Sequence, residues 1–217
     1  MRVSRVEACG KNKSKVFLEE GFAFVLYRAE VSDWGIAEGE ELPEEIYGRI
    51  LREILLPRAK EKALSLLEVQ SRTCRQLRDR LAREGYPREA VEEVMDFLAE
   101  YHLTDDGAYA RSYVAANKGK KSAKQMEWEL VQRGVEREEA SRALSEEGHD
   151  EEQAVRRYLE RKLGGRKTAL LQEKSRIWAA LGRKGFSPDV IKAVTGEMEE
   201  ESLSDSESDD PFGRGKD

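Results

Sequence analysis

The stretch RQLRDRLAREGYPREAVEEVM, residues 75–95, predicts two helices that meet at the corner Gly85-Tyr86-Pro87. Apolar residues four apart give the first helix a buried stripe, and the glycine suits a left-handed C-cap, where other residues meet a steric penalty. The pattern returns as KQMEWELVQRGVEREEASRAL at 124–144 and as KSRIWAALGRKGFSPDVIKAV at 174–194. The chain therefore repeats one helical corner three times, at intervals of about 50 residues.

Aligning the three copies shows which positions must be buried or must turn the chain. The aligned sets are Leu77, Met126 and Ile177; Leu81, Leu130 and Leu181; Gly85, Gly134 and Gly185; Val91, Ala140 and Ile191; and Val94, Ala143 and Val194. A pair of helices cannot bury its apolar faces alone, so we expect a third helix in each copy. It begins at Thr104-Asp105-Asp106 in the first copy and at Asp150, with Gln153 as in a capping box, in the second.

The first 31 residues are different in character, because β-branched and aromatic residues dominate KVFLEE and FAFVLYRAEV. They predict an antiparallel pair with a turn at Glu19-Glu20-Gly21, and residues 2–8 form a third strand. So small a sheet needs a helix to pack on, and Leu42 to Leu55 supplies one. Its apolar face is formed by Ile46, Ile50, Leu51 and Ile54. Pro57 interrupts it, and a second helix follows to about Val69.

We therefore predict a mainly α protein of tandem three-helix modules that form an elongated curved body, with a small N-terminal antiparallel β-sheet extension. The predicted boundaries are 1–57 for the extension with its helix, 58–114, 115–163 and 164–198 for the three modules, and 199–217 for an acidic disordered tail. Stacked repeats commonly bind other macromolecules along their length.

The formal net charge of −6 is concentrated at one end of the chain. Residues 199–217 hold eight acidic side chains against Arg214 and Lys216, so the other 198 residues carry 36 basic and 36 acidic groups. Within these, residues 148–198 hold 11 basic and 7 acidic groups. The third copy therefore lies in a basic neighbourhood beside an acidic tail.

No catalytic constellation, cofactor loop or metal-ligand spacing is visible in the sequence. His102 and His149 have no Cys or carboxylate partner at metal-ligand spacing, and capping explains the pair Asp105-Asp106. Cys9 and Cys74 are too few for a disulfide framework and fit free thiols in a reducing cytoplasm. No apolar run approaches the length of a membrane span, and no signal peptide is recognisable.

Clusters of basic residues are the candidate binding sites for an anionic partner. A solvated face laced with ion pairs is the alternative, and it fits Arg78, Arg80 and Arg83 among their acidic neighbours. For residues 156–167 the acids thin out, and the two interpretations stay open. The predicted contact residues are Arg72, Arg75, Lys118, Lys120, Lys121, Lys124, Arg157, Arg161, Lys162, Arg166, Lys167 and Lys184. Tyr158 and Trp178 could stack on bases, although the spacing of Tyr158 favours the core.

Three motifs in order resemble the RecX family, regulators of the bacterial recombinase RecA. They are ALSLLEVQSRTCRQLRDRLAREGY at 63–86, LTDDGAYARSYV at 103–114, and the glycine corners of the second and third copies. The resemblance implies a non-enzymatic inhibitor, without cofactor, that acts as a cytoplasmic monomer. Such a protein lies in the groove of the RecA–single-stranded DNA filament, contacts adjacent protomers, and depresses ATP hydrolysis, strand exchange and SOS coprotease activity. The alternative is a nucleic-acid-binding helical repeat protein that acts without RecA.

The sequence also departs from the family pattern. Ser122-Ala123 stand where Gly-Pro is frequent, and Gln125 and Glu127 stand where Arg is frequent. These changes move the expected basic contact to Lys118, Lys120, Lys121 and Lys124. For the acidic tail, we consider a polyanion mimic that competes for the basic third module, with a purely solubilising role as the alternative.

Overall fold

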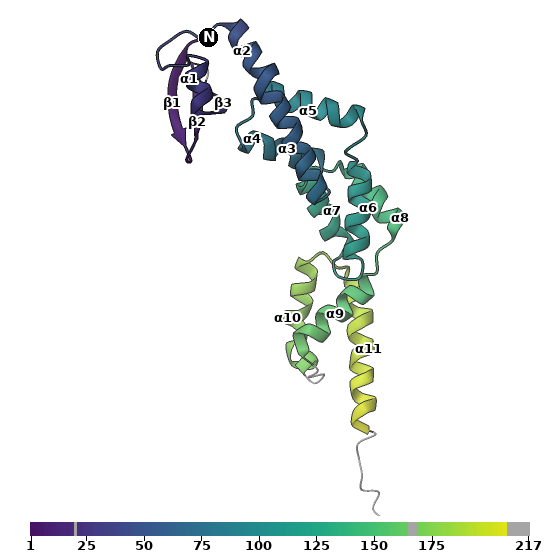
Figure 1. The fold of residues 1–217 in the computed structure, drawn as a ribbon. Helices are drawn as coiled ribbons and strands as arrows, with labels where there is room; N and C mark the ends of the chain where they lie inside the picture. The colour runs from purple at the N-terminus through teal and green to yellow at the C-terminus, as the bar shows by residue number, and fades with distance from the viewer. Residues whose placement is uncertain (20, 165–168, 208–217) are drawn as a thin grey trace, which may run out of the picture. The chain divides into compact units, whose positions relative to one another are not determined.

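The computed structural model describes residues 1–19, 21–164 and 169–207 (Figure 1). Two compact units divide the chain, Met1–Tyr109 and Ala110–Asp217, so the boundary falls inside the sixth helix. The first unit begins with β1 (Val3–Cys9), β2 (Lys13–Leu18), β3 (Gly21–Tyr27), α1 (Arg28–Asp33), α2 (Glu44–Ile50), the π-helical segment η1 (Leu51–Leu55), α3 (Leu56–Val69), α4 (Cys74–Arg83) and α5 (Arg88–Glu100). Then follow α6 (Asp106–Asn117), α7 (Ala123–Gln132), α8 (Arg137–Glu147), α9 (Glu151–Leu163), α10 (Ala169–Arg183) and α11 (Pro188–Glu207).

The N-terminal sheet confirms the predicted antiparallel strands, in the order β1-β2-β3. The third strand ends earlier than predicted, because residues from Arg28 onward form helix α1 instead of continuing the strand to Val31. The Glu30 carboxylate explains the change. It accepts a 2.9 Å hydrogen bond from the N–H of Tyr27 at the start of the helix and forms an ion pair with Arg58 of α3.

The predicted helical face covers the sheet, as expected. Ile50 of that face is buried in one core with Phe24 and Leu26, and Ile46, Leu51 and Ile54 pack against it. The predicted interruption at Pro57 is wrong, because the helical backbone runs through η1 into α3. In η1 the N–H of Leu56 bonds to the carbonyl of Leu51, five residues back, so the ladder is shifted just before the proline that lacks a donor.

The repeated corner is present in all three copies. Gly85, Gly134 and Gly185 have φ of +92°, +95° and +86°, the left-handed region that glycine adopts without penalty. The aligned apolar residues around them are buried without exception: Leu77, Leu81, Val91, Val94, Met126, Leu130, Ala140, Ala143, Ile177, Leu181, Ile191 and Val194. The alignment therefore identified both the turn and the core positions of the repeat.

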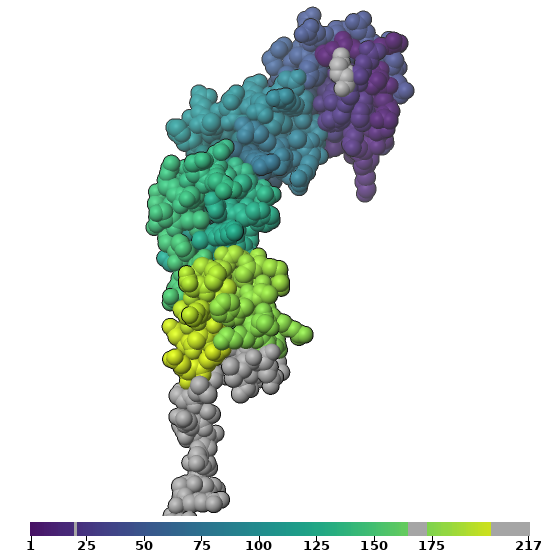
Figure 2. All heavy atoms as spheres, turned by 180° about the vertical axis from the view of Figure 1, so that it is seen from behind, coloured from purple at the N-terminus to yellow at the C-terminus, as the bar shows by residue number. Residues whose placement is uncertain are grey.

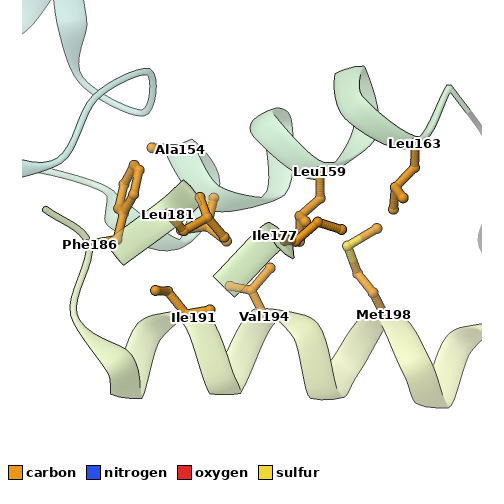
Figure 3. Packing of buried hydrophobic residues seen from close by; sticks show 10 residues of the cluster. Ala154, Leu159, Leu163, Ile177, Leu181, Phe186, Ile191, Val194 and Met198 are labelled. Carbon is orange, nitrogen blue, oxygen red and sulfur yellow. The ribbon is translucent and has the colours of Figure 1, made fainter. Parts of the chain in front are cut away.

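Helix α9 packs in the third module, whereas the predicted boundary at 163/164 placed it in the second. Its residues Ala154, Leu159 and Leu163 share a core with α10 and α11, as Figure 3 shows. Its first turn is hydrogen-bonded to the second module, because the Glu151 carboxylate accepts a 2.9 Å hydrogen bond from the N–H of Ala123 at the start of α7. One helix thus joins two successive modules, whose atoms abut in Figure 2.

A similar hydrogen bond at a helix start is present in the first unit. Helices α3, α4 and α5 form one core, and the Asp106 carboxylate of α6 accepts a 2.9 Å hydrogen bond from the N–H of Cys74 at the start of α4. Asp105 caps α6 through the N–H of Ala108, at 2.8 Å. The adjacent carboxylates therefore serve two different helices.

The predicted disorder of the acidic end from residue 199 is wrong for residues 199–207. Helix α11 continues to Glu207, while residues 208–217 lie outside the described part of the chain. Met198 is buried in the third core, and Glu199 forms a 2.8 Å ion pair with Lys174 of α10. These contacts hold the helix beyond the predicted end.

Candidate anion-binding site

A small basic cleft lies in the second unit, where α9 meets the corner after α10. Its volume is about 140 Å³, and four predicted contact residues line it: Lys120, Arg157, Arg161 and Lys184. Ala154, Tyr158 and Phe186 complete the lining. The structure therefore brings together cations that lie as far as 64 positions apart in the sequence, from 120 to 184.

Helix α9 presents two of these cations on one face. Arg157 and Arg161 are four residues apart, so their side chains lie one turn apart on the helix. The apolar stripe of α9 that includes Leu159 and Leu163 is buried in the third core, which leaves both arginines exposed. The helix then ends at Gly164, whose φ of +55° is left-handed.

Lys120 reaches the cleft because Gly119 allows the loop after α6 to approach α9. Gly119 has a φ of +65°, and a Cβ there would overlap Oε1 of Gln153. The Lys120 ammonium donates a 2.7 Å hydrogen bond to the carbonyl of Ala116. An ammonium has three donors, so two remain for an anion.

A hydrogen bond to its carbonyl group fixes the backbone of Lys184. Its carbonyl oxygen accepts a 2.6 Å hydrogen bond from the buried hydroxyl of Ser122, which fixes the corner beside the start of α7. Its ammonium lies 5.8 Å from the centre of the Tyr158 ring, within range of a cation–π contact. Tyr158 is half-buried against the third core, so it both supports the core and lines the cleft.

The charge of the cleft is uncompensated within the described residues. No carboxylate lines it, and Arg157, Arg161 and Lys184 form no ion pair in that part of the chain. The neighbouring Arg156, by contrast, pairs with Glu197. Several like charges around one concave surface favour a multivalent anion such as a phosphate-bearing polymer.

Two other predicted lysines have structural partners. Lys118 donates a 2.8 Å hydrogen bond to the carbonyl of Glu147 at the end of α8. Lys121 donates 2.7 Å hydrogen bonds to the Tyr113 hydroxyl and to the Glu129 carboxylate. Burial alone would raise the pKa of Glu129, but hydrogen bonds from Lys121, Tyr113 and Gln125 outweigh it and lower that pKa to about 2. Lys121 therefore stabilises the second module.

The other predicted residues that the structure describes lie outside the cleft. Lys162 is exposed on α9, and Lys124 is exposed in the first turn of α7. Arg72 and Arg75 belong to the first unit, where Arg72 is half-buried and Arg75 is exposed. Arg166 and Lys167 lie outside the described residues. Arg183 and Trp128, which were not among the predicted residues, line a hollow together with Lys184.

The described residues hold no cluster of His, Cys, Asp or Glu side chains able to bind a metal ion. Among the same residues, none of the helices combines the length and apolar character needed to cross a membrane. The Cys74 thiol is half-buried and lies 3.5 Å from the Thr104 hydroxyl, and burial raises its pKa.

Comparisons with known proteins agree with the modules seen in the structure. Residues 59–98 match the first three-helix domain of RecX, which covers α3 to α5, and residues 150–195 match its third three-helix domain. The second match begins at α9 and thus supports its place in the third module.

Relatives that align with most of the chain are named regulatory protein RecX. Regulatory protein RecX of Clostridium botulinum strain Alaska E43 is 28% identical over 90% of this chain and 95% of its own length. That of Caldanaerobacter subterraneus subsp. tengcongensis is 31% identical over 70% of this chain and 78% of its own.

Two solved structures share the fold. A crystal structure of regulatory protein RecX is 24% identical and matches with a TM-score of 0.57 over 90% of this chain and 98% of the other. RecX from Lactobacillus salivarius is 25% identical and matches with a TM-score of 0.53 over 66% and 96% of the two chains. By its domains, its relatives and its fold, the chain belongs to the RecX family of regulatory proteins.

Proposed function

We propose that the chain inhibits RecA by binding the RecA–single-stranded DNA filament across adjacent protomers. The observation that carries the proposal is the basic cleft, because Arg157, Arg161 and Lys184 have no ion pair there within the described residues. Membership of the RecX family supports RecA as the partner. Binding depresses ATP hydrolysis, strand exchange and SOS coprotease activity.

Preferential binding to one state of the filament is sufficient for inhibition. ATP hydrolysis requires successive protomers to change their relative positions, so a rigid body that bridges two of them opposes that change. Helices such as α9, bonded to one module and packed in the next, make neighbouring modules act together. Linked weak contacts to a repeated target then add through effective concentration. The protein acts as a cytoplasmic monomer.

The direct test is the DNA-dependent ATPase of RecA on single-stranded DNA, with fewer copies of this protein than of RecA. ATP hydrolysis should fall, because each bound chain constrains more than one protomer. An unchanged rate at equal concentrations of the two proteins would refute inhibition.

RecA-independent binding of nucleic acid is the second candidate, and the same cleft favours it. Electrophoretic mobility shifts of single-stranded DNA with and without RecA separate the two. A body in which 36 basic and 36 acidic groups balance should bind naked DNA weakly and with steep salt dependence. Strong binding of naked DNA at physiological salt, without an effect on RecA, would favour the second candidate.

A further inference from the structure

A second hollow lies beside the basic cleft, and Lys184 lines both. Its volume is about 380 Å³, and its other lining residues are Lys124, Gln125, Trp128, Gly182, Arg183 and Gly185. The two features thus form one continuous surface on the second unit, with Lys184 at the junction.

Trp128 is unusually exposed for a tryptophan, with 63% of its surface accessible. It lies on α7 two residues from both Met126 and Leu130, which are fully buried, so it points away from the core. In the described part of the chain, no ring or cation stacks on its indole. An exposed indole offers a large flat apolar face to a ligand.

Two other lining residues of the hollow carry no side-chain bulk. Gly182 and Gly185 contribute only backbone, and a Cβ at Gly182 would meet no atom within 4 Å. At Gly185 a Cβ would lie 3.1 Å from both Cβ of Lys124 and Oγ of Ser122, so only glycine fits without displacing its neighbours. The hollow therefore combines an aromatic side chain with bare backbone in its lining.

The rim of the hollow is positively charged. Lys124, Arg183 and Lys184 have no ion pair within the described residues, and no carboxylate lines the hollow. Exposed aromatic rings interleaved with unpaired cations are the arrangement that binds single strands, because bases stack on the rings while cations follow the phosphates.

We propose that this hollow binds one base of single-stranded DNA stacked on Trp128, with the adjoining phosphates against Lys184 and the basic cleft. The proposal rests on the proposed function, which supplies single-stranded DNA as the polymer. The side chains of an acidic peptide would use the cations, but Asp and Glu offer no aromatic ring to stack on the indole. Duplex DNA fits poorly, because its bases are already stacked on one another.

The test measures binding of two labelled strands of equal length, oligothymidine and an abasic strand, by fluorescence anisotropy without RecA. Trp128→Ala should weaken binding of oligothymidine about five- to 150-fold and leave binding of the abasic strand unchanged. Trp128→Phe should retain most of the affinity, since it keeps a ring. Lys184→Ala should weaken both strands and lower the slope of log affinity against log salt by about 1.

Tyr101→Ala is the matched control, because Tyr101 is an exposed aromatic residue of the first unit, 60% accessible, and should have no effect. Circular dichroism verifies that each variant is folded. Equal losses on both strands, or no binding of oligothymidine at low salt, would overturn the proposal. So would unchanged binding of both strands by Trp128→Ala combined with lost inhibition of RecA, which would assign the indole to a protein partner. Because the binding assay contains no RecA, a chain that stacks a base yet leaves the RecA ATPase unchanged refutes the proposed function and not this inference.

Discussion

The hydroxyl of Ser122 donates a 2.6 Å hydrogen bond to the carbonyl oxygen of Lys184 and accepts a 3.1 Å hydrogen bond from the N–H of Gln125. One fully buried side chain thus caps α7 and holds the corner between α10 and α11 against it. A glycine at position 185 leaves room for this contact, because a Cβ there would lie 3.1 Å from the same hydroxyl oxygen. Ser122 is therefore a joint between successive modules.

Replacing Ser122 with alanine should destabilise the second unit. The variant loses a helix cap and leaves the carbonyl of Lys184 without its side-chain donor, a change that costs about 1–3 kcal/mol. Urea denaturation followed by circular dichroism measures the loss. Ser122→Thr is the control, because Thr73 fills the corresponding place before α4 and accepts from the N–H of Gln76 at 3.2 Å. Equal losses for alanine and threonine would show that the hydroxyl has no such role.

Gly85→Ala should destabilise the first unit more severely. The Gly85 carbonyl accepts a 3.0 Å hydrogen bond from the N–H of Val25, so the corner covers the free edge of β3. A Cβ at Gly85 would overlap Cγ2 of Val25 and lie 2.8 Å from its Cβ, in a backbone with φ of +92°. Backbone strain and the overlap together should cost about 2–5 kcal/mol, measured by urea denaturation.

Two controls separate strain from overlap. Gly10→Ala has a similar φ of +69° but meets no atom within 4 Å, so it should cost only about 1–2 kcal/mol. Adding Val25→Ala to Gly85→Ala removes the overlapping methyl and should recover part of the lost stability. A double variant less stable than both single variants would mean that Val25 is not the obstacle.

The repeat was predictable because its signals are local. Leu77 and Leu81 mark a buried stripe, and Gly85 marks a left-handed turn, whatever the rest of the chain does. The helix after Tyr27 was not predictable from local signals. The segment Arg-Ala-Glu-Val suits a strand by composition, and its helical form depends on contact between Glu30 and Arg58 of α3, 28 residues further along the chain. The module of α9 was likewise hidden, because an apolar stripe does not specify which neighbouring helices will cover it.

The candidate site was predictable only in part. Arg157 and Arg161 lie one helical turn apart, so their common face follows from the sequence alone. Lys121 looks equivalent to Lys120 in the sequence, yet contacts with Tyr113 and Glu129 engage it in the module. The signal for Trp128 was present, since it lies two residues from both buried positions 126 and 130 and so cannot share their face.

Acid should remove the stabilisation that comes from Glu129. Its folded pKa of about 2 lies below the ordinary 4.5, because hydrogen bonds from Lys121, Tyr113 and Gln125 outweigh the effect of burial. A depressed carboxyl pKa stabilises the fold above the unfolded pKa, so this contribution is complete above about pH 4.5 and is lost as pH falls toward 2. It amounts to at most about 3 kcal/mol.

The measurement compares unfolding free energies of the wild type and Glu129→Gln from pH 6 to pH 2. The wild type should be the more stable at pH 6, and the difference should shrink between pH 4.5 and 2. Glu138→Gln is the matched control, an exposed carboxylate of α8 with no hydrogen bond or ion pair in the described residues. A difference for Glu129→Gln that stays constant with pH would contradict the network's role.

Charge reversal in the basic cleft should weaken inhibition of RecA. Arg157→Glu combined with Arg161→Glu places two carboxylates on the surface proposed to meet the filament, while both side chains are exposed on α9. The concentration that halves the RecA ATPase rate should rise about tenfold or more, because attraction to phosphates becomes repulsion. Raising the salt concentration should reduce the gap between wild type and variant, as screening weakens both effects.

Arg137→Glu supplies the matched control. Arg137 is 74% exposed at the first position of α8, lies outside the cleft, and receives a carboxylate at a helix start, where negative charge is favourable. It changes the net charge in the same direction without touching the proposed surface. If Arg137→Glu weakened inhibition as much per charge as the cleft variant, the effect would come from overall charge, and the cleft would have no special role.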